Sequence, residues 1–245
     1  MPEYRLLPAG DTALVVEFGD QIDRELNLWV RALDRRLKEA RIDGITDCVP
    51  TFRSLLVHYD SLLLPAATLM ARIGDLMQDL QTAATAGRVW RLPACYDATL
   101  APDLDEVAAR TGLMPAQVVE RHSALTYHVY MLGFLPGQAY MGDLPAELSL
   151  PRRESPRLRI PAGSLAIATT MTCIFPMETP SGWHLIGRSP VRLWERTIGS
   201  EALLAPGDKV SFVPVSLREY EDLAARAAEG LLTIAPEDER VGAAA

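Results

Sequence analysis

The chain has 245 residues, 49% of them hydrophobic and 23% charged, and this globular composition excludes wholesale disorder. Its 24 Lys and Arg against 32 Asp and Glu give a net charge of −8, which disfavours nucleic acid and anionic membranes as partners. We expect no membrane span, because no apolar run reaches about 18 residues. The three cysteines are scattered and include no CxxC pair, so neither a zinc site nor a disulfide framework is indicated, and a reducing cytoplasm is the simplest interpretation.

The first 93 residues alternate between strand and helix patterns. Apolar residues spaced three and four apart predict a helix from Ile22 to Ala40, and Pro65 begins a second helix that extends to Leu80. Apolar and β-branched runs predict strands at 12–18, 45–49, 53–59 and 88–92. The order β-α-β-β-α-β predicts a ferredoxin-like α+β domain over residues 1–93.

Residues 94–230 are expected to form a second domain. Two short helices are predicted within 103–123. Between 133 and 214 lie eight of the 16 glycines and ten of the 18 prolines, a density that helix interiors do not tolerate. The short apolar runs between them predict the strands of a barrel or sandwich, at 164–169, 173–175, 183–186, 191–194 and 210–213. A helix at 216–228 and a mobile tail over 231–245 complete the chain.

Motifs of several common enzyme classes are absent from the sequence. It contains no GxxxxGK[ST], GxGxxG, HExxH or nucleophile elbow. The chain therefore has no recognisable phosphate cradle of its own, and a self-contained enzyme of those classes is disfavoured.

An arginine-rich segment is the first candidate for a binding site. Arg152, Arg153, Arg157 and Arg159 fall within eight residues, opposed by Glu154 alone, and prolines stiffen the segment. Arginine forks suit a carboxylate or a phosphate. The alternative is a solvated loop whose charges offset acids elsewhere, and from these residues alone that alternative is favoured.

A glycine-rich turn gives the second candidate. Gly133 and Gly137 in GFLPG can bring main-chain N–H groups close to a ligand, although a plain turn is the better interpretation of these residues alone.

The run 171–188 gives the third candidate. Thr172, Glu178, His184 and Arg188 could converge on a barrel rim, with Glu178 as a base or cation partner and Arg188 as an anion clamp. They could equally be turn and strand residues that never meet. His184 is the best chemical candidate among the four histidines, whereas His122 ends a predicted helix, where a cation favours the dipole. No histidine pair has metal-ligand spacing, so no metal site is expected.

Three segments together resemble one known family. They are HSALTYHVYMLGFLPGQAYMGDLP, PRRESPRLRIPAGSLAIAT and IFPMETPSGWHLIGRSPVRLW. They resemble the B subunit of 5-oxoprolinase, whose family is also called allophanate hydrolase subunit 1 or KipI-like, and GDTALVVEFGDQID resembles the N-terminal part of the family. The resemblance covers roughly residues 4 to 220 and implies a small α+β domain followed by a cyclophilin-like β-barrel.

The resemblance also implies an activity and partners. Family members work with a KipA-like C subunit, and together with an A subunit they hydrolyse 5-oxoproline to glutamate. The reaction uses ATP with Mg, and the resemblance implies that a partner subunit holds this nucleotide or shares it with this chain. Related proteins form the carboxyltransferase part of urea carboxylase, and one member inhibits a histidine kinase without catalysis. Two other functions therefore stay as alternatives, a carboxyltransferase-type role on a urea-like substrate and inhibition of a histidine kinase. A homo-oligomer is also possible as the assembly. The barrel alone would allow a prolyl isomerase, by analogy of fold only.

The resemblance gives weight to particular residues. Glu178 and Arg188 fall in ETPSGW and LIGR, which match family text, and the four arginines are implied to line a site or the partner interface. Residues 171–176 depart from the family, because Met-Thr-Cys-Ile-Phe-Pro stands where Gln-Thr-Gly-Ile-Tyr-Pro is usual, and Ser181 replaces a glycine. If this loop binds a polar ligand, hydrogen bonds worth about 1–3 kcal/mol each have been lost.

Overall fold

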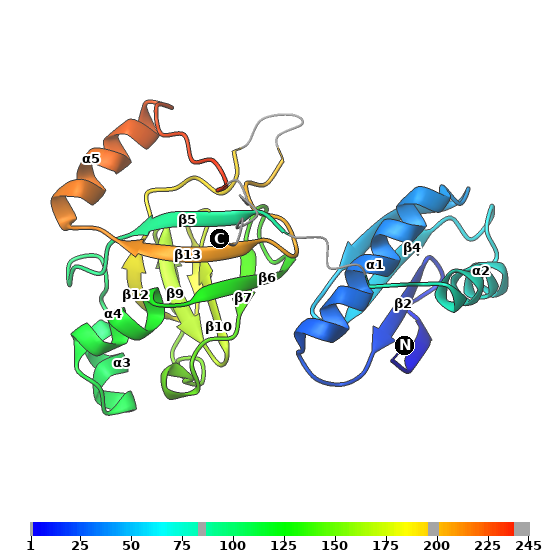
Figure 1. Cartoon of the computed structure of the whole chain (residues 1–245), viewed down its shortest axis with the longest axis horizontal. Coiled ribbons are helices and arrows are strands. Elements are labelled where there is room, and N and C mark those ends of the chain that lie inside the picture. Colours follow the sequence, from blue (N-terminus) through cyan, green and yellow to red (C-terminus); the bar gives the residue numbers. More distant parts are fainter. Residues whose placement is uncertain (1, 83–86, 196–200, 238–245) are drawn as a thin grey trace, which may run out of the picture. The chain divides into compact units, whose positions relative to one another are not determined.

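The chain folds into two compact units, residues 1–86 and 87–245, each with its own hydrophobic core (Figure 1). The computed structural model describes residues 2–82, 87–195 and 201–237. Within this described part, no helix combines the length and the apolar character needed to cross a bilayer.

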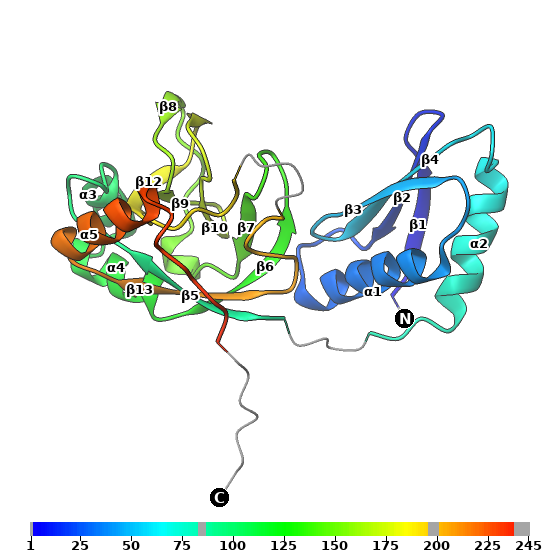
Figure 2. The same cartoon turned by 90° about the horizontal axis from the view of Figure 1, so that it is seen from above.

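The first unit is a four-stranded antiparallel sheet with two helices. The sheet order is β1-β2-β4-β3, from Tyr4–Pro8, Ala13–Phe18, Ser54–Tyr59 and Ile45–Pro50. Helix α1 (Arg24–Ala40) lies along one face of this sheet, and α2 (Ala66–Gln78) follows β4 (Figure 2). The side chain of Asp23 accepts the N–H of Glu25 at 2.7 Å and so fixes the start of α1.

The predicted ferredoxin-like arrangement is not confirmed. The sheet contains an additional first strand, β1, and the predicted strand at 88–92 is β5 (Val89–Ala94), which joins the second unit. The order in the first unit is therefore ββαββα. Trp90, Leu92 and Ala94 alternate and are buried in the second core. Such alternation identifies a strand but does not say which sheet the strand joins.

The second unit is built on a curled seven-stranded sheet that fits a cyclophilin-like fold. The order is β12-β9-β10-β7-β6-β13-β5, and every pair is antiparallel except β13 with β5. Its other strands are β6 (Thr126–Leu132), β7 (Ala139–Gly142), β9 (Ser164–Ala168), β10 (Met171–Ile174), β12 (His184–Arg188) and β13 (Lys209–Pro214). The predicted strand at 191–194 is wrong, because these residues form no strand.

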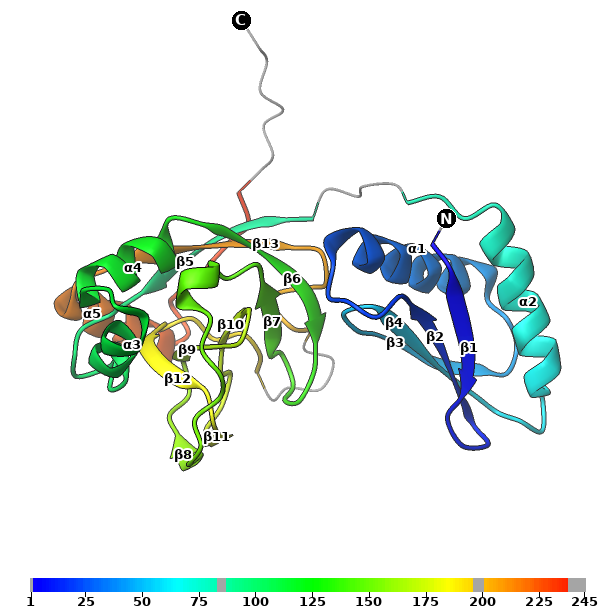
Figure 3. The same ribbon diagram turned by 90° about the horizontal axis from the view of Figure 1, so that it is seen from below.

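Short elements surround this sheet. Strands β8 (Arg157–Ile160) and β11 (Thr179–Ser181) pair as a separate two-stranded ribbon that extends from it (Figure 3). The helical elements are α3 (Leu104–Thr111), α4 (Pro115–Ser123), the 3₁₀ turn Ala146–Leu148 and α5 (Leu217–Ala228). Of the predicted tail at 231–245, residues 238–245 lie outside the described residues, and the N–H of Glu237 donates to the carbonyl of Val89 at 2.7 Å.

One pair of hydrogen bonds joins the two edges of the curled sheet. The N–H of Cys95, just after β5, donates to the carbonyl of Arg188 at the end of β12, and the N–H of Arg188 donates back, both at 2.8 Å. Gly187 lies directly beside this bridge. A Cβ at this position would lie 2.7 Å from the carbonyl oxygen of Cys95, so only glycine allows the two edges to meet.

Gly187→Ala is therefore expected to destabilise the second unit by about 1–3 kcal/mol, because the added methyl group overpacks the bridge. Urea unfolding followed by tryptophan fluorescence measures the change. Gly182→Ala is the matched control, since a Cβ at Gly182 has no neighbour closer than 3.6 Å. Equal stability of the two variants would contradict the steric role of Gly187.

Candidate functional site

A cavity of about 250 Å³ in the second unit brings together the three sequence segments singled out above. Its walls come from the β6–β7 loop, β7, the segment before β8, the end of β10, and β11 with the turn into β12. The lining residues are Phe134, Gln138, Tyr140, Arg152, Pro156, Phe175, Pro180, Ser181, Gly182 and Trp183. A larger cavity of about 360 Å³ beside residues 191–195 contains none of the predicted site residues.

Aromatic rings form much of the wall of this cavity. Trp183 meets Tyr140 edge-on with ring centroids 6.0 Å apart, and Phe175 with centroids 6.3 Å apart. Phe134 adds a ring that is 68% exposed at the mouth. Burial raises the pKa of Tyr140, so its phenol stays neutral at physiological pH. The cavity is therefore suited to a small ring with apolar edges.

The two predicted glycines shape the loop that carries Phe134 and Gln138. Gly137 has φ of +74°, and a Cβ there would lie 2.5 Å from the Cβ of Trp194. The N–H of Gly133 donates to the carbonyl of Gln138 at 3.1 Å and closes the turn. Neither glycine lines the cavity.

Gln138 is a cavity residue that the sequence patterns did not single out. Its side chain is 1% exposed, and its Nε2 lies 3.8 Å from the Sγ of Cys173. Its Oε1 is buried and has no hydrogen-bond partner. A buried acceptor without a donor is costly, and Gln138 is one of the residues that line the cavity, so it is a candidate polar group for a ligand. Its place directly after GFLPG was the only signal in the sequence.

The four arginines have three different environments. Arg153 and Arg157 pair with the buried Asp103, and Arg153 also pairs with Glu106. Arg159 pairs with Glu178 at the surface. Arg152 is exposed, lines the cavity, and has no acidic partner among the residues that the structure describes. Arg152 is thus the arginine of this segment that is available to an anion.

Asp103 organises the region behind Arg152. Its carboxylate accepts two hydrogen bonds from Arg157, at 2.8 and 2.5 Å, and one from Arg153 at 3.1 Å. It also accepts the N–H of Leu185 in β12 at 2.7 Å. Asp103 is 2% exposed, and these contacts compensate its buried charge. Beside it, the guanidinium of Arg153 lowers the pKa of Glu106.

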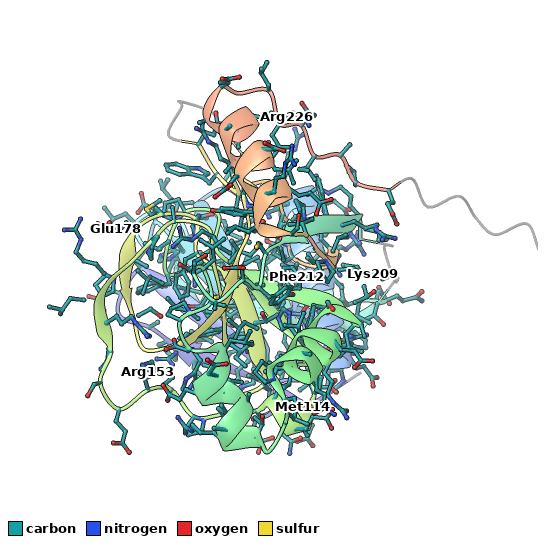
Figure 4. The ribbon with its side chains drawn as sticks, turned by 90° about the vertical axis from the view of Figure 1, so that its left-hand side faces the viewer. Met114, Arg153, Glu178, Lys209, Phe212 and Arg226 are labelled. Carbon is teal, nitrogen blue, oxygen red and sulfur yellow. The ribbon has the colours of Figure 1, made fainter. Side chains whose placement is uncertain are left out.

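The two predicted catalytic residues lie outside the cavity lining. Glu178 is exposed and accepts hydrogen bonds from Arg159 at 2.9 and 2.6 Å. His184 is fully buried, with Nε2 2.9 Å from the carbonyl oxygen of Pro151 and Nδ1 4.0 Å from Oε1 of Glu106. Figure 4 shows Glu178 and Arg153 at separate places on this unit.

Arg188, the predicted anion clamp, lies at the bridge that joins the sheet edges, and its buried Nε has no hydrogen-bond partner. It does not line the cavity. Among the described residues, no group of three or more His, Cys, Asp or Glu could hold a metal ion.

Thr172 belongs to a buried hydrogen-bond chain in the core. Its hydroxyl donates to the carbonyl of Ala166 at 3.1 Å and accepts from Nε2 of His122 at 2.8 Å. Nδ1 of His122 is therefore left to accept the hydroxyl of Tyr96, also at 2.8 Å. The expected charged His122 at a helix end is wrong: the C-terminal end of α4 packs into the core, and burial lowers the pKa of His122 to about 3.

The sequence matches the model of a known family over residues 4–204, described as "Carboxyltransferase domain, subdomain C and D". The chain is 34% identical over 231 residues to the B subunit of 5-oxoprolinase from Bacillus subtilis, covering 89% of this chain and 95% of that protein. It is 36% identical over 217 residues to the B subunit of 5-oxoprolinase from Escherichia coli O157:H7, covering 87% and 97%. The chain belongs to the family of 5-oxoprolinase B subunits.

Solved structures agree with the fold described above. TTHA0988 superposes with a TM-score of 0.74 at 34% identity over 83% of this chain. This chain spans only 40% of the length of TTHA0988. The urea carboxylase of Kluyveromyces lactis superposes with a TM-score of 0.81 over 96% of this chain and 24% of its own. At 20% identity, that likeness concerns the fold alone.

The buried, neutral His122 predicts a pH dependence of stability. Its pKa falls from the ordinary 6.5 to about 3 in the folded state because burial disfavours the cation. Below pH 6.5 the unfolded chain binds a proton that the folded chain does not, so stability falls as the pH drops towards 3. The expected slope is about 1.4 kcal/mol per pH unit.

Urea unfolding of the wild type and of His122→Gln between pH 7 and pH 5 measures this slope. The variant lacks the titrating ring, so its stability should fall less steeply with decreasing pH, whatever its stability at pH 7. Parallel pH curves for the two proteins would show that His122 is not the group responsible.

Proposed function

We propose that this chain is the B subunit of an ATP-dependent 5-oxoprolinase, and that its aromatic cavity binds 5-oxoproline. The observation that carries the proposal is Arg152, a guanidinium without an intramolecular acidic partner among the described residues, at the edge of a cavity with aromatic walls. The names of the Bacillus subtilis and Escherichia coli relatives support the same choice of substrate.

The chemistry of 5-oxoproline matches this cavity group by group. The molecule is a five-membered lactam with apolar methylenes, an N–H donor, a carbonyl acceptor and a carboxylate. The rings of Tyr140, Phe175 and Trp183 suit the methylene edge, and Arg152 suits the carboxylate through two parallel hydrogen bonds. Gln138, with its unpaired acceptor, lies where the polar edge of the lactam can be held. The volume of about 250 Å³ fits a small ligand.

The proposal assigns ATP, with its Mg, to the partner proteins. The sequence has no phosphate-binding glycine loop, and the described residues contain no metal-binding group, so this chain does not fit a nucleotide on its own. ATP would supply the phosphoryl group that activates the lactam oxygen. The residues of this chain bind and orient the lactam, in complex with a KipA-like C subunit and with an A subunit.

The first test is an assay of the reconstituted complex. Release of ADP should depend on 5-oxoproline and should require this chain together with the A and C subunits, because this chain has no phosphate-binding glycine loop of its own. Omission of this chain is expected to abolish the activity. Full activity without this chain would contradict the proposal. Inactivity of a well-folded complex would do so as well, and a urea-like substrate would then be tested.

Arg152→Ala in that complex should raise the KM for 5-oxoproline about 10- to 100-fold, because one charge-assisted hydrogen-bond pair to the carboxylate is lost. Arg218→Ala is the control, since Arg218 is an exposed arginine on α5 outside the cavity and its replacement removes the same charge. Similar KM values for the two variants would remove Arg152 from the substrate site.

A further inference from the structure

We infer that His184 is a positioning residue for Arg152, holding the backbone that carries this arginine at the edge of the cavity. The inference rests on the proposed function, because it concerns how the carboxylate of the substrate is recognised. It gives His184 a role other than proton transfer.

The first observation is the hydrogen bond on the N-terminal side of Arg152. Nε2 of His184 lies 2.9 Å from the carbonyl oxygen of Pro151, the residue directly before Arg152. A carbonyl oxygen only accepts, so the ring proton is on Nε2 and His184 is the donor. His184 itself is anchored in β12, which pairs with β9 through Ile167. Pro151 is therefore attached to the sheet through the imidazole.

The second observation is the anchoring on the C-terminal side. The N–H of Arg153 donates to the carbonyl of Gly182 at 2.7 Å, and Gly182 itself lines the cavity. The guanidinium of Arg153 pairs with Asp103 at 3.1 Å and with Glu106 at 2.6 Å. Both neighbours of Arg152 are thus fixed, while its own side chain is exposed at the cavity.

This arrangement implies that replacing His184 would weaken the binding of an anionic group at Arg152. A long exposed arginine that binds a carboxylate loses side-chain freedom, and it loses less net affinity when its backbone is already held. Without the imidazole, Pro151 and Arg152 have no backbone hydrogen bond of their own to the sheet and are held only through their neighbours, at the carbonyl of Leu150, which accepts the N–H of Thr169 at 2.6 Å, and at Arg153. Proton transfer by His184 is disfavoured by geometry, because Nε2 is engaged and Nδ1 is buried without a hydrogen-bond partner.

The test is a double-mutant cycle between His184 and Arg152 in the complex of this chain with the A and C subunits. The kinetic constants are kcat and KM for 5-oxoproline, and Ki for 2-pyrrolidinone, the same lactam without the carboxylate. His184→Ala should raise the KM about tenfold, which is the typical effect of one lost hydrogen bond, with kcat and the Ki of 2-pyrrolidinone changed less than about twofold. His184→Gln, whose amide can donate to Pro151, should restore the KM.

In the Arg152→Ala background, His184→Ala should add less than about a twofold change in KM, because a residue that acts through another has no independent effect. The inference would be overturned if the effects of the two substitutions on KM multiplied in the double mutant. An equal weakening of 2-pyrrolidinone binding in His184→Ala, or a fall in kcat at constant KM, would also overturn it. If His184→Ala does not fold, His184→Asn replaces it in the cycle, because the shorter amide does not reach Pro151.

The failure of the proposed function gives a different result. If the wild-type complex neither turns over nor binds 5-oxoproline, the substrate assignment and the inference both fall. If the wild type is active and the two substitutions affect KM independently, only the role of His184 falls.

Discussion

The buried carboxylate of Asp103 is the constraint on which the candidate site depends. It receives hydrogen bonds from the N–H of Leu185 and from the guanidinium groups of Arg153 and Arg157, and the N–H of Asp103 itself donates to the carbonyl of Leu185 at 3.0 Å. A buried charge with fewer partners would be strongly destabilising. Because Asp103 lies at the start of α3 and its partners belong to β12 and to the arginine-rich segment, satisfying this one charge fixes three parts of the chain at a single point.

That constraint also decides which arginine is available. Four arginines in eight residues are alike in sequence, and their environments differ because the acids with which three of them pair lie far away along the chain. Asp103 is 50 residues from Arg153 and 54 from Arg157, and it satisfies both. Arg152, between the anchored Pro151 and Arg153, is left to face the cavity. Arg153 and Arg157 thus pair with a buried acid, and Arg152 is the member of the segment that lines the cavity.

Periodicity predicted most of the individual elements, and two of its failures have a similar cause. The helices α1, α2 and α5 and the strands β2, β4, β9 and β13 lie where the pattern of apolar residues placed them. The ferredoxin-like topology failed because the alternating residues of β5 are buried in the second core, and local alternation carries no information about the partner strand. The aromatic wall was missed for a similar reason. Tyr140, Phe175 and Trp183 lie on separate segments and meet only when the sheet curls.

The departures at 171–176 affect the cavity less than the sequence alone implied. Met171 and Cys173 are buried and do not line the cavity, and burial keeps the pKa of the Cys173 thiol well above its ordinary value. Of this run, Phe175 lines the cavity, and a phenyl ring there offers packing without a hydrogen bond. Cys173 contacts the cavity only through Gln138, whose Nε2 lies 3.8 Å from the Cys173 Sγ. Under the proposed function, polar recognition therefore falls to Gln138 and Arg152, and the apolar ring and the carboxylate of 5-oxoproline would use different parts of the cavity.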